Sequence, residues 1–313
     1  MKALAIDFGG THASLGVVED QSLLASETID TDGAKSMAAI LPRVAETFRA
    51  LAKQVSIRPE DCAGISVGIA ALADVRIGRV ISTNVKYEDS KEIDLDAWSR
   101  KSLGLPLRIE NDARMALLGE SYAGAARGFT EVVMLTLGTG IGGAAMIEGK
   151  LLRGKHAQAG CLGGHLPALF NGRQCTCGAI GCAESEAGGW ALRGLVKEWP
   201  GSSSSTLFKY DQVGFKELFD EAARGDEIAV AIRDRCLKVW AVNAVALVHA
   251  YDPELIVMGG GVMKSADVII PFVESYVQKH AWTPWGKVQV RTAALGNNAA
   301  LLGAIPLLSE IRP

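Results

Sequence analysis

Apolar positions along the chain repeat with two different spacings, and each spacing predicts its own kind of element. Short apolar runs bounded by glycine or polar residues predict strands, at 2–8, 14–18, 62–71, 75–82, 106–109, 131–137, 144–147, 255–258 and 288–291. Apolar positions three and four residues apart predict a helix at 35–53. Helical patterning with start and stop signals predicts further helices at 186–199, 228–250 and 267–279, and another directly after residue 112. Strands and helices are interspersed along the chain, which predicts an α/β fold.

Two of the predicted strands lead through a glycine-rich turn into a second strand. The first turn reads Asp7-Phe8-Gly9-Gly10-Thr11, and the second reads Gly138-Thr139-Gly140. Glycine lets backbone amides approach phosphate oxygens closely, while the carboxylate of Asp7 is suited to hydrated magnesium. A plain hairpin turn is the alternative for either loop taken alone. Because strand, turn and strand recur in the second half of the chain, we expect two phosphate-binding half-sites.

A third glycine cluster follows the buried run at 255–258. It consists of Gly259, Gly260 and Gly261. Three glycines after a parallel-type strand permit close approach by a nucleotide, and a tight strand-to-helix turn is the alternative. We expect nucleotide contact here.

One histidine and three cysteines are concentrated in a short glycine-rich segment. They are His165, Cys175, Cys177 and Cys182. One imidazole and three thiolates form a closed tetrahedral zinc site, which is typical of a structural rather than a catalytic ion. Ordinary buried or redox cysteines are the alternative. Since three of the six cysteines of the chain fall within eight residues, we favour zinc.

Composition narrows the function classes. The 313 residues are enough for two compact domains. A net charge of −3 without a concentrated run of Lys or Arg predicts no binding to nucleic acid or to an anionic membrane. The first ten residues do not resemble a signal peptide, and no apolar run reaches the roughly 18 residues of a membrane helix. We therefore expect a cytoplasmic protein that acts on small molecules.

Three segments carry a resemblance to the ROK family of sugar kinases and related repressors. Residues 175–184 match the family's Cys-x-Cys-Gly-x-x-Gly-Cys-x-Glu segment, residues 7–11 match its Asp-x-Gly-Gly-Thr phosphate loop, and residues 110–113 match Glu-Asn-Asp-Ala. The resemblance implies a two-domain actin-like ATPase fold, related to ribonuclease H, with ATP and sugar in the interdomain cleft. The implied domains are 1–114 plus 298–313, and 115–297.

The same resemblance implies an ATP-dependent sugar kinase in which Asp112 accepts the proton of the attacking hydroxyl, typically the primary one. From its position alone, Asp112 is equally well explained as a helix cap. The family's sugar contacts correspond to Asn84, Asn111, His165 and Glu184, and Asp7 would help to hold Mg²⁺. The phosphate and nucleotide contacts would be Gly9, Gly10, Thr11, Gly138, Thr139, Gly140, Gly259, Gly260 and Gly261. A homodimer is implied as well.

The sequence departs from the family in the segment that precedes the histidine. Residues 159–165 read Ala-Gly-Cys-Leu-Gly-Gly-His, so Cys161 occupies the place of a sugar-contacting glutamate and one glycine is extra. A thiol is a poorer hydrogen-bond partner than a carboxylate. We expect Cys161 to lie in the sugar site and specificity to differ from plain glucose, unless the extra glycine lets a neighbouring residue take over.

Two other function classes are weighed against the kinase. A sugar-sensing regulator of the same family would carry a DNA-binding helix-turn-helix ahead of the phosphate loop, and here that loop begins at Asp7. A chaperone-like ATPase of the actin superfamily would need neither Asp112 nor the zinc segment. The sugar, the hydroxyl and a donor other than ATP, such as polyphosphate, remain open.

Overall fold

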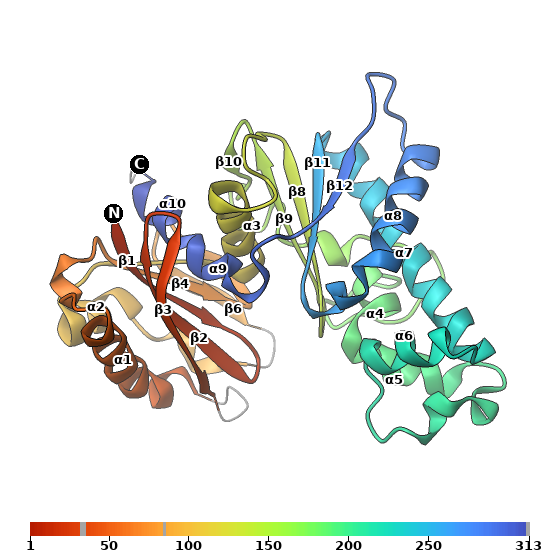
Figure 1. Ribbon diagram of the computed structural model, residues 1–313, viewed down its shortest axis with the longest axis horizontal. Helices are drawn as coiled ribbons and strands as arrows, with labels where there is room; N and C mark the ends of the chain where they lie inside the picture. The colour runs from red at the N-terminus through yellow and green to blue at the C-terminus, as the bar shows by residue number, and fades with distance from the viewer. Residues whose placement is uncertain (32–35, 84–85, 311–313) are drawn as a thin grey trace. The chain divides into compact units, whose positions relative to one another are not determined.

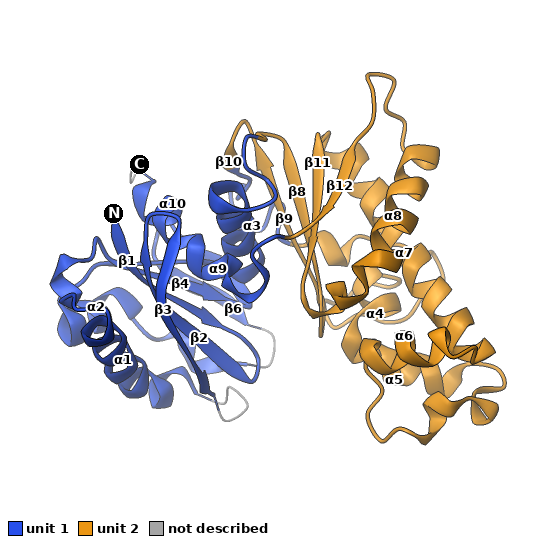
Figure 2. Ribbon diagram, in the orientation of Figure 1, with its two compact units in different colours: residues 1–128, 151–161, 294–313 blue, residues 129–150, 162–293 orange. Residues whose placement is uncertain are grey.

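The computed structural model describes residues 1–31, 36–83 and 86–310, and the chain in it forms two compact units (Figure 2). Unit 1 comprises residues 1–128, 151–161 and 294–313, and unit 2 comprises residues 129–150 and 162–293. These divisions differ from the expected boundaries at 114 and 297. Helix α3 (Asp112–Ala123) packs against α9 (Ala299–Leu302) and α10 (Ala304–Ser309), so all three helices belong to unit 1.

Unit 1 is built on a five-stranded sheet with the order β3-β2-β1-β4-β7. Strands β1 (Lys2–Phe8), β2 (His12–Glu19) and β3 (Ser22–Asp30) form an antiparallel meander. Strands β4 (Ile65–Ile69) and β7 (Leu107–Asn111) extend the sheet in parallel with β1. The carboxyl ends of β1, β4 and β7 therefore lie along one edge.

Helices cover both faces of the unit 1 sheet (Figure 1). Alternate side chains of β1 point to opposite faces. Leu4, Ile6 and Phe8 pack with α1 (Met37–Gln54) and α2 (Leu95–Leu103), whereas the small side chains of β1 on the other face allow α9 and α10 to approach. The predicted helix at 35–53 is confirmed as α1, whose cap Ser36 accepts a hydrogen bond from the amide of Ala39.

A short hairpin follows β4 and corrects one predicted strand. Residues 75–82 were expected to be continuous, but β5 (Ala71–Asp74) and β6 (Arg79–Thr83) are joined by a turn at 75–78. The carboxylate of Asp74 accepts hydrogen bonds from the backbone and side chain of Arg76, and Gly78 has a positive φ of 66°. These turn interactions outweigh the apolar pattern.

Unit 2 repeats the layout of unit 1, with the sheet order β10-β9-β8-β11-β12. Strand β8 (Val132–Leu137) pairs antiparallel with β9 (Ile141–Ile147), and β11 (Leu255–Gly259) and β12 (Gln289–Thr292) continue in parallel. Strand β10 (Lys150–Leu151) lies at the other edge. The repeat of strand, glycine turn and strand that the sequence predicts is therefore present in both sheets.

The long helix α7 (Glu227–Tyr251) organises the core of unit 2. It packs against α4 (Ala183–Ala187), α6 (Phe215–Ala223) and α8 (Ala266–His280). Its fully buried Trp240 donates a hydrogen bond to the carbonyl of Ala187 and packs against the ring of Phe215. The predicted helix at 186–199 is interrupted at Gly188, which has extended backbone angles. It therefore forms two helices, α4 (Ala183–Ala187) and α5 (Gly189–Glu198).

The remaining elements are short or peripheral. The other α-helices are α6 (Phe215–Ala223) and α8 (Ala266–His280), and the 3-10 turns are η1 (Pro59–Asp61), η2 (Glu88–Lys91), η3 (Gly163–His165), η4 (Ser202–Ser204), η5 (Thr206–Lys209), η6 (Gly261–Ser265) and η7 (Gly296–Asn298). In the part of the chain that the structure describes, no helix combines the length and apolar character needed to cross a membrane.

Candidate active site and metal centre

Asp7 lies near the carboxyl end of β1, where neighbouring strands leave room for its side chain. Its register partner on β4 is Gly68, and Gly68 is in turn paired with Glu110 on β7. A Cβ atom on Gly68 would lie 3.1 Å from Oδ1 of Asp7. That buried oxygen has no hydrogen-bond partner among the described residues. An orphaned carboxylate oxygen at a strand end is suited to a hydrated cation such as Mg²⁺.

Asp112 is the first residue of α3, and Asn111 is the residue that caps this helix. Oδ1 of Asn111 accepts hydrogen bonds from the amides of Ala113 and Arg114, at 3.1 and 3.2 Å. Nδ2 of Asn111 donates to Oδ1 of Asp112 at 2.9 Å and to the carbonyl of Ala71 at 3.2 Å. The helix-cap role therefore belongs to Asn111, which also orients the carboxylate of Asp112.

Burial raises the pKa of both carboxylates. The pKa of Asp7 rises to about 7 because the group is buried and because the negative charge of Asp112 lies nearby. Burial also raises the pKa of Asp112, against the opposing effect of hydrogen bonds from Ala113 and Asn111. A carboxylate with a raised pKa is a stronger proton acceptor, which is the property required of a general base.

The glycine turn of unit 1 is a tight hairpin turn with unused donors. The amide of Gly9 donates to the carbonyl of His12 at 3.0 Å, and a Cβ atom on Gly9 would lie 2.9 Å from that oxygen. Among the described residues, the amides of Gly10 and Thr11 donate to no backbone carbonyl. The hydroxyl of Thr11 is 2.8 Å from Nδ1 of His12. The turn is thus a hairpin that can still offer two amides to an anion.

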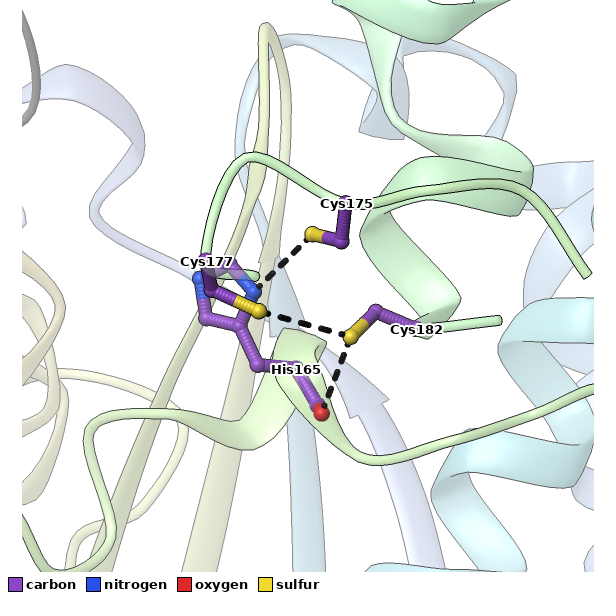
Figure 3. A group of neighbouring side chains, drawn as sticks. All are labelled: His165, Cys175, Cys177 and Cys182. Carbon is purple, nitrogen blue, oxygen red and sulfur yellow. Dashed lines mark hydrogen bonds between the residues drawn. The ribbon is translucent and has the colours of Figure 1, made fainter. Parts of the chain in front are cut away.

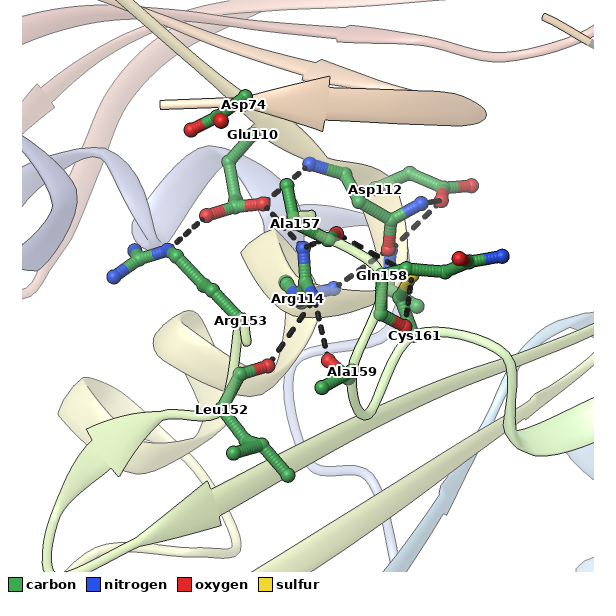
Figure 4. Close-up of polar contacts among 12 residues, drawn as sticks. Asp74, Glu110, Asp112, Arg114, Leu152, Arg153, Ala157, Gln158, Ala159 and Cys161 are labelled. Carbon is green, nitrogen blue, oxygen red and sulfur yellow. Dashed lines mark hydrogen bonds and ion pairs between the residues drawn. The ribbon is translucent and has the colours of Figure 1, made fainter. Parts of the chain in front are cut away.

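Cys161 is buried, and its thiol bonds within its own segment (Figure 4). The sulfur donates to the carbonyl oxygen of Gln158 at 3.3 Å and lies 3.9 Å from that of Ala157. Burial raises the pKa of the thiol. The side chain therefore uses its weak donor on the loop itself, while Gln158 is exposed beside it.

In unit 2, the second glycine turn rests on Glu184. Oε2 of this buried carboxylate accepts a hydrogen bond from the amide of Ile141 at 2.8 Å, and Oε1 accepts one from the indole of Trp190 at 3.1 Å. A Cβ atom on Gly140 would lie 2.5 Å from Oε2. The carbonyls of Gly138 and Thr139 accept hydrogen bonds from the first residues of α5. Glu184 thus fixes the shape of the turn, and each of its oxygens retains one acceptor site.

The glycines after β11 form a tight strand-to-helix turn. Gly260 has a positive φ of 92°, and a Cβ atom there would lie 2.2 Å from the carbonyl oxygen of Leu137. No side chain is compatible with this approach. Gly261 begins η6 and has open space where a Cβ atom would lie. The cluster thus forms a tight turn from β11 into η6, in which Gly261 leaves space beside the backbone.

The histidine and cysteines of the zinc segment converge on one point (Figure 3). The ligand atoms of His165, Cys175, Cys177 and Cys182 all lie within 4.8 Å of one another. Nδ1 of His165 is 3.5 Å from the sulfur of Cys175, and the sulfurs of Cys177 and Cys182 are 3.6 Å apart. Tetrahedral zinc gives edges of roughly 3.5 to 3.8 Å for these donors. The cluster therefore fits a structural zinc ion.

The paired glycines before His165 pack tightly against β9. Gly164 lies on β9 so closely that a Cβ atom would be 2.0 Å from the carbonyl oxygen of Ile141, and one on Gly163 would be 3.1 Å from Gly143. The side chain of Asn243 on α7 donates to the carbonyl of Gly163 at 2.9 Å. These contacts fix η3, so His165 is presented to the cysteines with Nδ1 facing Cys175.

Residues 3–311 match the family model described as "ROK family". The chain belongs to the ROK family. It is 31% identical over 317 residues to a glucokinase of Thermotoga maritima, covering 99% of this chain and 98% of that protein. A crystal structure of a ROK hexokinase from Thermus thermophilus superimposes with a TM-score of 0.80 at 30% identity, covering 98% of this chain and 97% of that one.

A second solved ROK structure is that of a glucokinase from Streptomyces griseus in complex with glucose and AMPPNP. Its TM-score is 0.78 at 27% identity, and the match covers 98% of this chain and 99% of that one. These likenesses confirm the predicted fold class, because the mixed α/β chain has the actin-like ATPase fold of ROK sugar kinases.

Within this ROK chain, unit 1 contains Asp7, the first glycine turn, Asn111, Asp112 and Cys161. Unit 2 contains the second and third glycine turns, Glu184 and the four predicted zinc ligands. The predicted sugar contact Asn84 lies outside the described residues.

Sequence reasoning missed the buried charges that hold the Cys161 segment (Figure 4). Arg114 is fully buried and donates to the carbonyls of Leu152, Ala157 and Ala159, at 3.1, 2.9 and 2.5 Å. It also pairs with the buried carboxylate of Glu110. The only sequence feature that could have indicated the burial of Arg114 is its position two residues after Asp112. The apolar periodicity does not distinguish a buried arginine from a surface arginine.

Proposed function

We propose that this ROK protein transfers the γ-phosphate of ATP to a hydroxyl, the 6-OH, of a hexose or hexose derivative. One observation supports the proposal above the others: Asp112 is a half-buried carboxylate of raised pKa at the carboxyl end of a parallel strand, oriented by Asn111. Open α/β sheets bind their ligands at this edge. The family match and the likeness to a kinase solved with glucose and AMPPNP point to the same reaction.

In the proposed reaction, Asp112 accepts the proton of the sugar hydroxyl as the hydroxyl oxygen bonds to the γ-phosphorus. The bond between that phosphorus and the bridging oxygen breaks, and ADP leaves with the bonding electrons. Asn111 holds the carboxylate of Asp112 through the 2.9 Å hydrogen bond. The raised pKa of Asp112 makes the proton transfer more favourable than it would be for an exposed aspartate.

The donor phosphates would bind to the glycine turns. The residues of these turns are Gly9, Gly10, Thr11, Gly138, Thr139 and Gly140. The cluster Gly259 to Gly261 would lie against the nucleoside. Magnesium, when bound, neutralises phosphate charge. Asp7 would hold it, because its Oδ1 has no partner among the described residues.

The side chains that would bind the sugar hydroxyls are Asn84, Asn111, Asp112, Cys161, His165 and Glu184. His165 would serve two purposes, because its Nδ1 faces the cysteine sulfurs and leaves Nε2 for a hydroxyl. The proposed Zn²⁺ is structural and fixes this ring. Glu184 supports the second glycine turn and would add a sugar contact through its remaining acceptor sites.

We further propose a cytoplasmic homodimer. Thiolate zinc sites persist in reducing compartments, which supports the location. The net charge of −3 without a basic run supports the absence of a nucleic-acid partner. The dimer follows from family membership alone, and light scattering that gives the 33.0 kDa of one chain would contradict it.

The function is tested by ADP formation from magnesium ATP across hexoses, amino sugars and glycosides. We expect turnover that depends on one class of sugar and a product phosphorylated at the 6-position, identified by NMR. Tight sugar binding without turnover by any donor, including polyphosphate, would replace the kinase with a sugar sensor. ATP hydrolysis without a sugar requirement would favour a nucleotide-driven ATPase.

A further inference from the structure

The side chain of Lys86 lies over the glycine turn of unit 1. Its Nζ atom is 1.8 Å from the point that a Cβ atom on Gly10 would occupy, and its Cε and Cδ atoms are 3.1 and 3.5 Å from that point. The ammonium group therefore fills the space beside the backbone of Gly10. A side chain at residue 10 would displace it, which gives a reason for glycine at this position beyond backbone freedom.

Tyr87 fixes the segment that carries Lys86. Its hydroxyl donates to the carbonyl of Gly9 at 3.0 Å, and its ring packs edge-on against Phe8 with centroids 5.4 Å apart. The residue is 3% exposed and has a positive φ of 54°, a conformation that costs free energy in a residue other than glycine. Two contacts to the strand end and turn thus hold the segment where Lys86 overlies Gly10.

The ammonium group is not used in an ion pair within the part of the chain that the structure describes. The next lysine in the segment, Lys91, forms an ion pair in which its Nζ is 2.9 Å from Oε2 of Glu88. Lys86 has no such carboxylate partner among the described residues. Asp7 is the acidic group of the same turn, and its buried Oδ1 has no hydrogen-bond partner among the described residues. The ammonium group of Lys86 is therefore not bonded to that oxygen, and its charge is available for a ligand.

The surroundings select an anion as that ligand. The amides of Gly10 and Thr11 donate to no backbone carbonyl among the described residues, so two N–H groups and one ammonium group occupy one turn. Asp7 lies near the carboxyl end of β1, and Asp112 directly follows β7, which runs parallel to β1 in the same sheet. A phosphate on this turn would therefore lie at the same sheet edge as the group that would deprotonate the acceptor hydroxyl.

We propose that Lys86 binds the terminal phosphates of the phosphoryl donor. The proposal rests on the proposed kinase function. It adds a positively charged side chain to the phosphate site, because neither glycine turn itself contains a lysine or arginine. A lysine ammonium group stabilises phosphate charge as a point charge with three donors, and it acts most strongly where water is excluded. The same chemistry suits the end of ATP and the end of a polyphosphate chain.

The test measures nucleotide affinity by calorimetry, so that it does not depend on sugar turnover. Lys86→Met should weaken binding of AMPPNP by about tenfold to a hundredfold, as expected for loss of a charge-assisted hydrogen bond. AMP affinity should change by less than about threefold, because AMP lacks the terminal phosphates. Lys86→Arg should restore most of the affinity, and Lys91→Met, in the same segment, should match the wild type.

Each other outcome is decisive. Equal AMPPNP affinity in wild type and Lys86→Met, or equal losses for AMPPNP and AMP, would overturn the proposal. So would a wild-type protein that binds neither AMPPNP nor tripolyphosphate. Binding of tripolyphosphate in preference to AMPPNP, with the same loss in Lys86→Met, would support Lys86 and identify polyphosphate as the donor. If the wild type binds AMPPNP but phosphorylates no sugar, the proposed kinase function is wrong. The difference in AMPPNP affinity between wild type and Lys86→Met still tests whether Lys86 binds the phosphates.

Discussion

Asp7 and Asp112 are two half-buried carboxylates near the carboxyl ends of β1 and β7, two parallel strands that β4 separates. Gly68 makes this possible, because the strand between them has no side chain at the level of Asp7. Burial and the neighbouring charge raise the pKa of Asp7, and burial raises that of Asp112. Ionising both carboxylates costs free energy in the free protein, because their negative charges lie close together and are partly removed from water. A bound cation offsets this cost.

The raised pKa of Asp7 predicts how stability depends on pH. The folded chain keeps this proton up to about pH 7, whereas the unfolded chain releases it near the ordinary aspartate pKa of 3.8. The folded state therefore binds more protons between these values, and stability falls as pH rises through this window. Asp7→Asn, which cannot ionise, should exceed the wild type in free energy of unfolding at about pH 8 by a few kcal/mol.

Urea denaturation at several pH values measures this difference. The advantage of Asp7→Asn should shrink toward pH 4, where the carboxyl group is protonated in both states. Parallel stability curves for the two proteins between about pH 4 and pH 8 would contradict the raised pKa.

Cys161 yields a prediction about sugar preference. Its thiol donates to carbonyl oxygens of its own loop, and serine can make the same hydrogen bonds. Cys161→Ser should therefore keep the ranking of sugars in kcat/KM. Cys161→Glu places a charge against those carbonyls, so its side chain must turn away and the ranking should change. An unchanged ranking in Cys161→Glu would remove residue 161 from the sugar site.

At the scale of elements, α3 and the segment 151–161 are joined by buried charges. Arg114 holds three carbonyls of that segment, and Arg153 bonds Glu110 and Glu310. Glu110 immediately precedes Asn111 and Asp112, so the same ion pairs support the strand that presents the base. Buried ions of this kind stabilise a structure only while all partners remain.

Arg114→Met should therefore be strongly destabilising. The substitution removes one ion-pair partner of the buried Glu110 and leaves three carbonyls without their hydrogen-bond donor. We therefore expect the free energy of unfolding, measured by urea denaturation, to fall by about 3 to 5 kcal/mol. Arg153→Gln is the matched control, because Arg153 is partly exposed and bonds only carboxylates. Arg153→Gln should lower the free energy of unfolding by less than Arg114→Met does. Equal losses in the two variants would show that the carbonyl contacts contribute little.

The zinc segment yields a second prediction at this scale. Wild-type protein should contain one zinc ion per chain by elemental analysis. Cys177→Ser should lose the metal and unfold at a lower temperature, because bound metal stabilises the loop only while its ligand set is complete. Cys62→Ser, at a buried cysteine of unit 1, should retain zinc. Full zinc content in Cys177→Ser would remove Cys177 from the ligand set.

Elements with strong periodicity were predictable from the sequence, and those set by local polar contacts were not. The apolar positions of α1 recur at three and four residues, and α7 is a long, mostly apolar run after its cap Asp226. Both helices lie where the sequence places them. The turn between β5 and β6 depends on Asp74 and Arg76, and the break between α4 and α5 falls at Gly188. In these two places, hydrogen bonds and backbone angles override apolar spacing.

At the scale of the whole chain, two sheets of the same topology each present a glycine turn after their first strand. Motif residues could be assigned from the sequence because their chemistry is carried by residue type and spacing. The positions of Arg114 and Lys86 could not, since both depend on segments far apart in the chain that fold together. Glu184 shows the same limit, because its support of the second glycine turn is visible only in the structure.

The most direct test of the account compares Asp112→Asn with the wild type in sugar-dependent ADP formation. Loss of a general base should lower kcat by about 10² to 10⁴-fold while sugar and AMPPNP still bind. Asp94→Asn is the control, because Asp94 caps α2 and asparagine caps equally well. It should retain wild-type turnover. Asp112→Asn that keeps its kcat within about threefold of the wild type would contradict the central claim.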